Sequence, residues 1–137
     1  MSSPVLVLTT GGTIDKVYFD ASSEYEIGEP TVPHVFREAG VALEWRLHSL
    51  LKKDSLEMTD EDRIAIRKAC EEAPESRILI THGTDTMSVT AEALVGNPEK
   101  TIVLTGALAP ARFRVTDAIF NLGLALRQKG YHQEALR

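Results

Sequence analysis

The stretch VLVLTTGGT, residues 5–13, decides the fold class of this 137-residue chain. It opens with a continuous apolar run and ends in threonine and glycine. Two later stretches repeat the pattern, ILITHGTDT at residues 78–86 and IVLTGA at residues 102–107. Continuous apolar runs are typical of strands that are buried on both faces, as in a parallel sheet. The sequence therefore predicts three buried parallel strands, each of which ends in a polar turn.

The segments between these strands carry the apolar spacing of helices. Thr59 and the three acidic residues after it predict the start of one helix, and Pro74 predicts its end. A second stripe is formed by Met87, Ala91 and Leu94, and a short helix is expected over Pro33–Ala39. The longest stripe consists of Val115, Ala118, Ile119, Leu122, Ala125 and Leu126. Strands that alternate with helices predict an α/β fold: three-layer, flavodoxin-like and doubly wound, with a mostly parallel sheet.

Two further segments depart from this regular pattern. Trp45–Leu50 alternates between apolar and polar residues, which predicts an edge strand. Gly12–Pro33 has little helical period, and it carries three aromatic residues together with several carboxylates. A loop or hairpin of that length is uncommon in a compact domain and is often a lid or a binding loop. A solvent-exposed acidic loop without a binding role explains the same composition equally well.

Length and composition indicate a single domain over residues 1–137. A content of 43% hydrophobic and 26% charged residues excludes a disordered or collagen-like chain. Fifteen basic and 20 acidic residues give a net charge of −5, which argues against nucleic-acid binding. No apolar run approaches the ~18 residues of a membrane span, and the amino terminus lacks the regions of a signal peptide. With one cysteine, Cys70, we expect a reducing, cytoplasmic location.

Polar residues gather at the three predicted strand ends. Seven threonines follow the apolar runs, together with His82 and Asp85. The carboxyl ends of parallel strands lie along one edge of a sheet, where ligands bind near the switch in strand order. Thr-Gly pairs are also ordinary turn chemistry. Three such endings nevertheless favour a ligand site.

Several classes of site fit this edge less well than a hydroxyl nucleophile does. The glycine patterns of phosphate-binding loops are absent, and the residues after Thr13 do not resemble the helix that a nucleotide or flavin loop requires. A phosphorelay receiver needs acidic residues at the first strand end, where this chain has threonines. The four histidines are scattered, so no metal site is predicted. His82 is expected to be structural and Cys70 to lie in the core.

A site with a threonine nucleophile fits the residues at this sheet edge better than these other classes of site do. Threonine is weak at its own pKa and needs a nearby base or an activating cation, with donors for the oxyanion. The Gly11-Gly12 pair allows the backbone to approach a substrate closely, and Thr84-Asp85 brings a second hydroxyl beside a carboxylate. No Gly-x-Ser-x-Gly motif marks a serine triad.

Two of these stretches resemble the signature motifs of bacterial-type L-asparaginases: TGGTI at residues 10–14 and THGTDTM at residues 81–87. IVLTGA is similar to the third strand of the family's N-terminal domain, and the order and spacing match to about residue 126. DKVY (residues 15–18) and KDSL (residues 53–56) resemble a short branch of that family. The resemblance implies hydrolysis of asparagine to aspartate and ammonia through an acyl-enzyme, without a cofactor.

The resemblance also implies catalytic roles for four residues. Thr13 matches the family's nucleophile. Tyr25 matches its tyrosine partner, on a segment that would form a mobile lid. Thr84 and Asp85 match the second hydroxyl and the acid beside it, and Asp85 also holds the α-amino group of the substrate.

Further residues match the family's substrate contacts. Ser55 matches the serine that contacts the substrate carboxylate, and Gly12 and Gly83 complete the substrate-binding set with Thr84 and Asp85. Leu56 stands where family members often carry glutamine. The ligand implied is a small molecule, asparagine or aspartate.

The chain departs from the family in two ways. The catalytic lysine, which follows a further strand in the family, has no match, because residues 127–137 contain no β-rich run. The family's C-terminal domain has no counterpart either. The lysines nearest the motifs stand at other positions: Lys16, Lys52 and Lys53. We therefore expect a weak or inactive asparaginase site, and the alternative is a non-catalytic amino-acid-binding or assembly domain.

The third predicted strand suggests how the chain assembles. Ile102–Leu104 is expected at an exposed sheet edge, which proteins usually cover or pair. A second copy of the chain would cover that edge, so we expect a homo-oligomer.

Overall fold

Four parallel strands form the central sheet. The structure is a computed structural model that describes residues 4–18, 25–113 and 115–127. The strands are β1 (Val5–Gly11), β4 (Trp45–Lys53), β5 (Arg77–Thr81) and β6 (Thr101–Thr105), and they lie in the order β4-β1-β5-β6. The chain passes from β1 outward to β4, then returns across β1 to β5 and β6. The switch in strand order therefore lies between β1 and β5, as the flavodoxin-like prediction requires.

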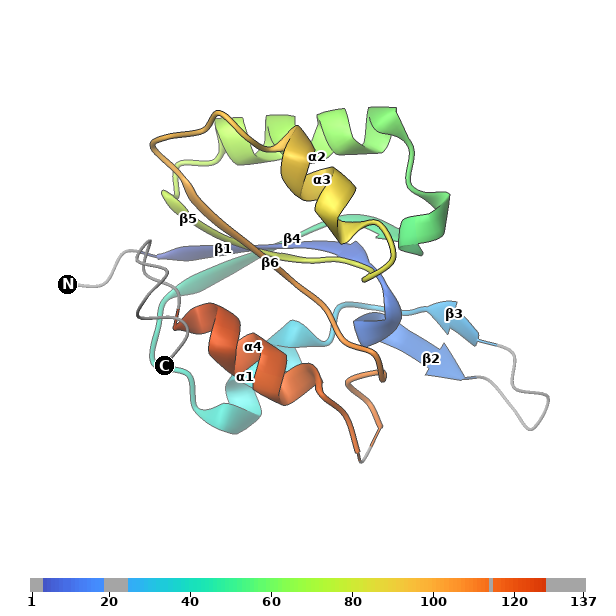
Figure 1. Cartoon of the computed structure of the whole chain (residues 1–137). Helices are drawn as coiled ribbons and strands as arrows, with labels where there is room; N and C mark the ends of the chain where they lie inside the picture. The colour runs from blue at the N-terminus through green and yellow to red at the C-terminus, as the bar shows by residue number, and fades with distance from the viewer. Residues whose placement is uncertain (1–3, 19–24, 114, 128–137) are drawn as a thin grey trace.

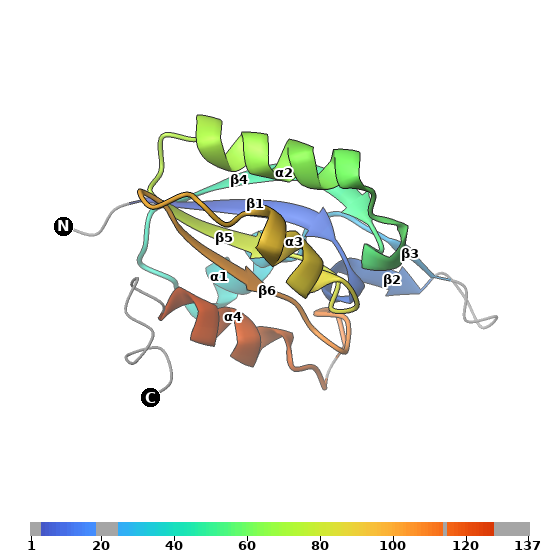
Figure 2. The same cartoon turned by 45° about the horizontal axis from the view of Figure 1, so that its top comes forward.

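Helices cover both faces of this sheet. Figure 1 shows α2 (Asp60–Glu72) and α3 (Met87–Ala93) above it, with α1 (Val32–Ala39) and α4 (Ala118–Leu126) below, and Figure 2 shows the same layers from another side. Successive side chains of β1 alternate between the two cores, because Val7 packs on the side of α1 and α4, and Leu8 packs on the side of α2. The predicted three-layer, doubly wound α/β fold is confirmed.

Four hydroxyl residues lie in register across the central sheet. Thr9 of β1 is paired with Ser49 of β4 on one side and with Thr81 of β5 on the other, and Thr81 is paired in turn with Thr105 of β6. A row of hydroxyl residues therefore crosses the sheet at the level where β5 and β6 end and shortly before β1 ends. The predicted meeting of the three strand ends is confirmed.

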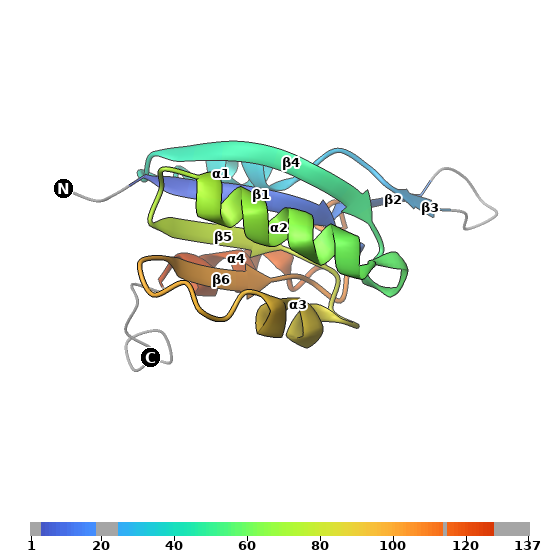
Figure 3. The same ribbon diagram turned by 90° about the horizontal axis from the view of Figure 1, so that it is seen from above.

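The irregular segment after β1 forms a hairpin. A short 3-10 turn, η1 (Thr13–Asp15), leads into β2 (Lys16–Tyr18), which pairs antiparallel with β3 (Tyr25–Ile27). Figures 1 and 3 show this two-stranded sheet projecting beyond the carboxyl ends of the central strands. The acidic residues Asp20 and Glu24, on which part of the lid hypothesis rests, lie outside the described residues.

Several elements begin and end where the sequence predicts. Thr59 caps α2 in a capping box, because its hydroxyl accepts from the Asp62 N–H while the Asp62 carboxylate accepts from the Thr59 N–H. The short helix α1 ends at Gly40, whose φ of +64° is left-handed. β4 is an edge strand of the described sheet and continues to Lys53. None of the helices in the described ranges is long and apolar enough to cross a membrane.

Two predicted apolar stripes require correction. The last helix begins at Ala118, and Val115 precedes it with 85% of its surface exposed. Ile119 is 57% exposed, so the buried face of α4 consists of Ala118, Leu122 and Ala125. Ile119 also lies three residues before Leu122, but the helix turns the side of Ala118, Leu122 and Ala125 toward the sheet, so apolar spacing alone made the predicted stripe too wide.

The stripe predicted for α3 was wrong in part, although Leu94, directly after the helix, is buried in the core as expected. Ala91 is exposed, and the buried residue within this helix is the polar Thr90. Thr90 faces inward because its hydroxyl has buried hydrogen-bond partners. A polar side chain with such partners can take a position that hydrophobicity assigns to an apolar one.

Candidate functional site

Gly12 and Gly83 bring the two motif turns into backbone contact. Gly12 has a φ of +89°, and a Cβ atom there would lie 2.6 Å from the Gly83 nitrogen. A Cβ atom at Gly83 would lie 2.7 Å from the Oγ and Cβ atoms of Ser55. Real Cβ atoms do not approach other atoms so closely, and only glycine adopts the Gly12 conformation without strain. The turns that carry Gly12, Gly83 and Ser55 therefore meet at the switch in strand order.

The turn after β6 joins the same cluster. A Cβ atom at Gly106 would overlap the carbonyl oxygen of His82 and would lie 3.5 Å from Cγ2 of Thr84. The His82 N–H donates to the carbonyl of Thr105 at 2.9 Å, which fixes the two turns against each other. All three strand ends that the sequence singles out thus converge on one place.

The candidate reactive groups flank the contact between the glycines. Thr13 directly follows Gly12 and is half-buried in η1, whereas Thr84 and Asp85 follow Gly83 and are exposed. The Gly12 N–H donates to the carbonyl of Lys53 at 3.0 Å, so this group holds the turn and does not face a substrate oxyanion. Two hydroxyls and a carboxylate consequently follow the two glycines of this tight backbone contact.

Ser55 is buried but has an unused hydroxyl. It is 1% exposed, and its Oγ atom has no hydrogen-bond partner among the described residues. Its backbone is held on both sides: Asp54 caps the 3-10 turn η2 (Ser55–Glu57), and the Thr86 hydroxyl donates to the Ser55 carbonyl at 2.8 Å. A buried hydroxyl without a partner is rare, and a bound ligand or water usually satisfies it. Thr9 and Thr81 in the central strands have the same property, so it is compatible with a ligand contact at Ser55 but does not single this residue out.

His82 is fully buried and takes part in a chain of hydrogen bonds. Its Nδ1 atom lies 2.7 Å from the Gly83 carbonyl, and its Nε2 atom lies 2.7 Å from the Thr90 hydroxyl, which in turn accepts from Nε of Arg63 at 3.0 Å. Since a carbonyl only accepts, we assign the ring proton to Nδ1. Burial, together with the charge of Arg63, lowers the pKa of His82 and keeps the ring neutral. The predicted structural role of His82 is confirmed.

Tyr25 lies on the hairpin. It occupies the first position of β3, directly opposite Tyr18 of β2. Lys16 of β2 forms an ion pair of 3.7 Å with Asp54, which links the hairpin to the turn that carries Ser55. The hairpin that bears Tyr25 is thus tied to the cluster of turns through its root.

Sequence analysis missed two residues that hold the turn bearing Thr13. Asp15 accepts two hydrogen bonds from Thr31, and Arg112 donates to the carbonyls of Asp15 and Glu29. The signal for Asp15 was its place two residues after the candidate nucleophile. No local pattern pointed to Arg112, which is 97 residues away along the chain.

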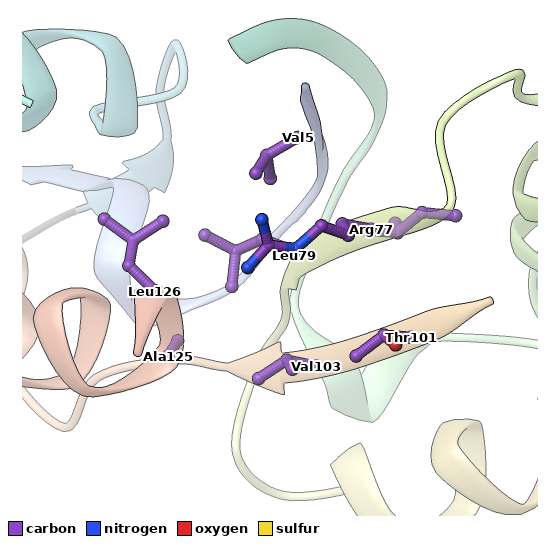
Figure 4. A pocket seen from close by; sticks show the side chains of 8 residues that line it. Val5, Arg77, Leu79, Thr101, Val103, Ala125 and Leu126 are labelled. Atoms are coloured by element: carbon purple, nitrogen blue, oxygen red, sulfur yellow. The ribbon is translucent and has the colours of Figure 1, made fainter. Parts of the chain in front are cut away.

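Two cavities differ in their relation to this cluster. One of about 370 Å³ opens between the hairpin and η2, lined by Glu26, Ile27, Lys52, Asp54 and Glu57. The other, shown in Figure 4, lies among Val5, Arg77 and Leu126 near the amino ends of the strands and has a volume of about 20 Å³. The second holds no more than a water molecule and lies at the wrong end of the sheet for the candidate residues.

Comparisons with known proteins agree with this geometry. The family model described as "Asparaginase, N-terminal" matches residues 4–135. The chain belongs to the asparaginase family. It is 36% identical to the L-asparaginase of Thermococcus kodakarensis over 93% of its own length and 41% of that protein's length. The solved structure of that thermostable L-asparaginase superposes with a TM-score of 0.80 at 32% identity, and the match covers 93% of this chain and 42% of that one.

A further structure supports the same assignment. L-asparaginase I from Vibrio cholerae O1 superposes with a TM-score of 0.80 at 25% identity, and the match covers 92% of this chain and 40% of that one. The chain thus spans about two-fifths of the length of the asparaginases it matches.

The lysines of this asparaginase-family chain that lie nearest the motifs each have a carboxylate partner. Lys16 pairs with Asp54, Lys52 with Glu29, and Lys53 with Asp62 at 2.8 Å. Among residues 4–18, 25–113 and 115–127, no group of three or more histidine, cysteine or acidic side chains is arranged to hold a metal ion. The candidate reactive groups beside the contact between Gly12 and Gly83 are Thr13, Thr84 and Asp85.

Proposed function

We propose that this chain forms an L-asparaginase-type amidohydrolase site, which converts asparagine to aspartate and ammonia. The observation that carries the proposal is the backbone contact between Gly12 and Gly83, because it brings the Thr13 and Thr84 turns together at the switch in strand order. Membership of the asparaginase family supports the same reaction.

The reaction proceeds in two steps. The Thr13 hydroxyl attacks the side-chain amide carbon of asparagine and loses its proton, the C–N bond breaks, and the nitrogen leaves as ammonia. Water then cleaves the resulting ester, which releases aspartate and restores the Thr13 hydroxyl. Tyr25 and Thr84 are the assisting hydroxyls, while Asp85 holds the α-amino group of the substrate.

Ser55 anchors the other end of the substrate in this proposal. Its buried hydroxyl has no partner in the described part of the chain, so it can donate to the substrate carboxylate without breaking an existing bond. Leu56, the next residue, is exposed, and its side chain can donate no hydrogen bond to a substrate. Gly12 and Gly83 complete the proposed substrate-binding set, because their missing side chains let the Thr13 and Thr84 turns meet beside the substrate.

The test is ammonia release from asparagine and, in parallel, from glutamine. We expect wild-type protein to release ammonia from asparagine and Thr13→Ala to fall to the uncatalysed rate. Thr59→Ala is the matched control, since Thr59 caps α2 and carries no proposed role in the reaction. Equal rates for wild type and Thr13→Ala would contradict the role of Thr13.

The second candidate function is a non-catalytic domain that binds an amino acid or serves in assembly. It is favoured by the ion pairs of Lys16, Lys52 and Lys53, which commit the lysines nearest the motifs to carboxylates. Calorimetric titration with aspartate separates the candidates. Binding without ammonia release favours the amino-acid binder, and neither binding nor turnover favours the assembly role.

We also propose that the chain forms a homo-oligomer and acts in the cytoplasm. Within the described sheet β6 is an edge strand, and such edges are commonly covered by a partner. The burial of the single cysteine in the core is compatible with a reducing compartment. Sedimentation velocity at working concentration tests the first point, and a monomer alone would contradict it.

A further inference from the structure

A buried carboxylate lies two residues after Thr13. Asp15 is 1% exposed, and its Oδ1 atom accepts the Thr31 N–H at 2.9 Å and the Thr31 hydroxyl at 2.8 Å. Thr31 is itself buried and directly precedes α1. Burying a carboxylate is unfavourable unless hydrogen bonds compensate it, so these two bonds are needed to keep Asp15 where it is. The side chain of Asp15 thus joins the turn η1 to the start of α1.

The backbone of the same turn is held at every carbonyl. Gly12 accepts from the Asp15 N–H at 3.1 Å, and the Thr13 carbonyl accepts from the N–H of Lys16. The Ile14 carbonyl accepts from the Ala111 N–H at 2.9 Å. The Asp15 carbonyl accepts from the Gly28 N–H and from Nη1 of Arg112. With four consecutive carbonyls occupied, the turn has little freedom to shift as a unit.

The hydrogen bonds that hold η1 come from two different parts of the fold. Gly28 and Thr31 belong to the returning arm of the hairpin and to the start of α1, whereas Ala111 and Arg112 follow β6. Arg112 also donates to the Glu29 carbonyl at 3.0 Å, so one guanidinium binds both arms of the hairpin. The root of the hairpin is therefore fastened to the domain on either side of Thr13.

We propose that Asp15 and Thr31 are positioning residues, which hold η1 so that the Thr13 hydroxyl stays beside the Gly83–Thr84 turn. Neither residue is proposed to touch the substrate. The kinetic part of this inference rests on the proposed amidohydrolase function, whereas the structural part does not. A displacement of about 1 Å at a reacting group can cost on the order of 100-fold in rate, which is why the turn has to be held firmly.

The electrostatics around Asp15 agree with this role. Burial raises the pKa of Asp15, while the bonds from Thr31 and the positive charges of Arg112 and Lys52 act in the opposite direction. Loss of the Thr31 hydroxyl leaves the carboxylate with one bond fewer in a buried place. The turn is then expected to relax toward solvent rather than keep an under-bonded charge.

The experiment compares Thr31→Val with Thr31→Ser. Valine removes the hydroxyl with little change of shape, whereas serine keeps the hydroxyl. We expect Thr31→Val to lower kcat about 10-fold or more with KM within about twofold of wild type, and Thr31→Ser to recover most of kcat. Thr59→Val is the matched control, because it removes a hydroxyl that accepts the Asp62 N–H at the start of α2.

Backbone amide hydrogen exchange in the same four proteins gives a readout that does not depend on turnover. We expect exchange at residues 13–15 and at Gly28, Glu29 and Thr31 to be about 10-fold faster in Thr31→Val, and unchanged there in Thr31→Ser and Thr59→Val. If Thr31→Val does not fold, Arg112→Gln serves instead, since Arg112 is exposed and donates to the same turn. It is expected to loosen the same two segments and to lower kcat with KM nearly unchanged.

Each outcome decides the inference. Unchanged exchange at residues 13–15 in Thr31→Val, or a failure of serine to restore kcat, would overturn it. An equal loss of kcat in Thr59→Val would also overturn it, because general destabilisation would then explain the effect. If wild-type protein releases no ammonia, the proposed function fails, and the exchange result alone decides whether Asp15 and Thr31 hold the turn.

Discussion

The backbone of Gly12 packs against the backbone of Gly83, with room for no side chain between them. A Cβ atom on Gly12 would lie 2.6 Å from the Gly83 nitrogen and 2.8 Å from its Cα atom. This contact joins β1 to β5 just beyond their last paired residues, Thr9 and Thr81. At this point the two motifs of the sequence meet in the candidate site.

Gly12→Ala is therefore expected to destabilise the protein more than the same change at Gly40. Both glycines have left-handed backbones, with φ of +89° and +64°, but a Cβ atom at Gly40 meets nothing within 4 Å. Gly40→Ala should cost about 1 kcal/mol for its backbone alone. Gly12→Ala adds a steric clash with backbone, so we expect roughly 2–4 kcal/mol. Urea unfolding of both variants measures the difference, and equal losses would contradict the close contact.

Thr90→Val is expected to destabilise the protein by about 2–3 kcal/mol, because it leaves Nε2 of His82 and Nε of Arg63 without this buried partner. Thr90→Ser keeps the hydroxyl and should recover most of the loss. Chemical denaturation gives the free energies of unfolding, and the ring resonances of His82 report whether its Nδ1 proton stays in place. An unchanged free energy of unfolding in Thr90→Val would show that this chain of hydrogen bonds contributes little to stability.

Asp117 is expected to make stability depend on pH in the acidic range. Hydrogen bonds from the backbone N–H groups of Leu108 and Ala109 lower the pKa of its carboxyl below the ordinary value. A group whose folded pKa is depressed stabilises the protein above its unfolded pKa, and this contribution is lost as pH falls through the folded pKa. Asp117→Asn should cost about 1 kcal/mol at pH 7.

That difference between wild type and Asp117→Asn should shrink as pH falls below about 4, the ordinary pKa of aspartate. Urea unfolding at pH 7, 5 and 3 measures it. A difference that grows on acidification would have the wrong sign for a carboxylate stabilised by these donors.

Cys70 is expected to be unreactive in the folded protein. It is fully buried between α2 and the sheet, and this burial raises the pKa of its thiol to about 11. Because the thiolate is the reactive form, alkylation near pH 8 should be at least about 100-fold slower in native protein than in urea. Mass spectrometry of iodoacetamide-treated samples follows the reaction. Rapid labelling of the native protein would show that α2 opens readily.

The sequence predicts the central strands and α2 well because their signals are local. The run Val5–Leu8 is apolar on both faces, and Thr59 has its capping partner three residues away. Failures occur where a tertiary contact outweighs hydrophobicity. Thr90 is buried because its hydroxyl donates to His82 and accepts from Arg63. Ile119 is exposed because α4 turns the side of Leu122 toward the sheet.

The candidate site divides in the same way. The sequence by itself determines which residues are present: apolar strands that end in Thr-Gly turns, and the two asparaginase-like motifs, whose resemblance to the family also singles out Ser55. Only the tertiary structure decides that Gly12 touches Gly83, that the Ser55 hydroxyl lacks a partner in the described residues, and that Asp15, Thr31 and Arg112 hold the turn of Thr13. The physical reason is the distance along the chain over which each kind of interaction acts. Strand and cap signals act over a few residues, whereas these contacts join segments 16 to 97 residues apart, whose approach depends on the packing of the whole sheet.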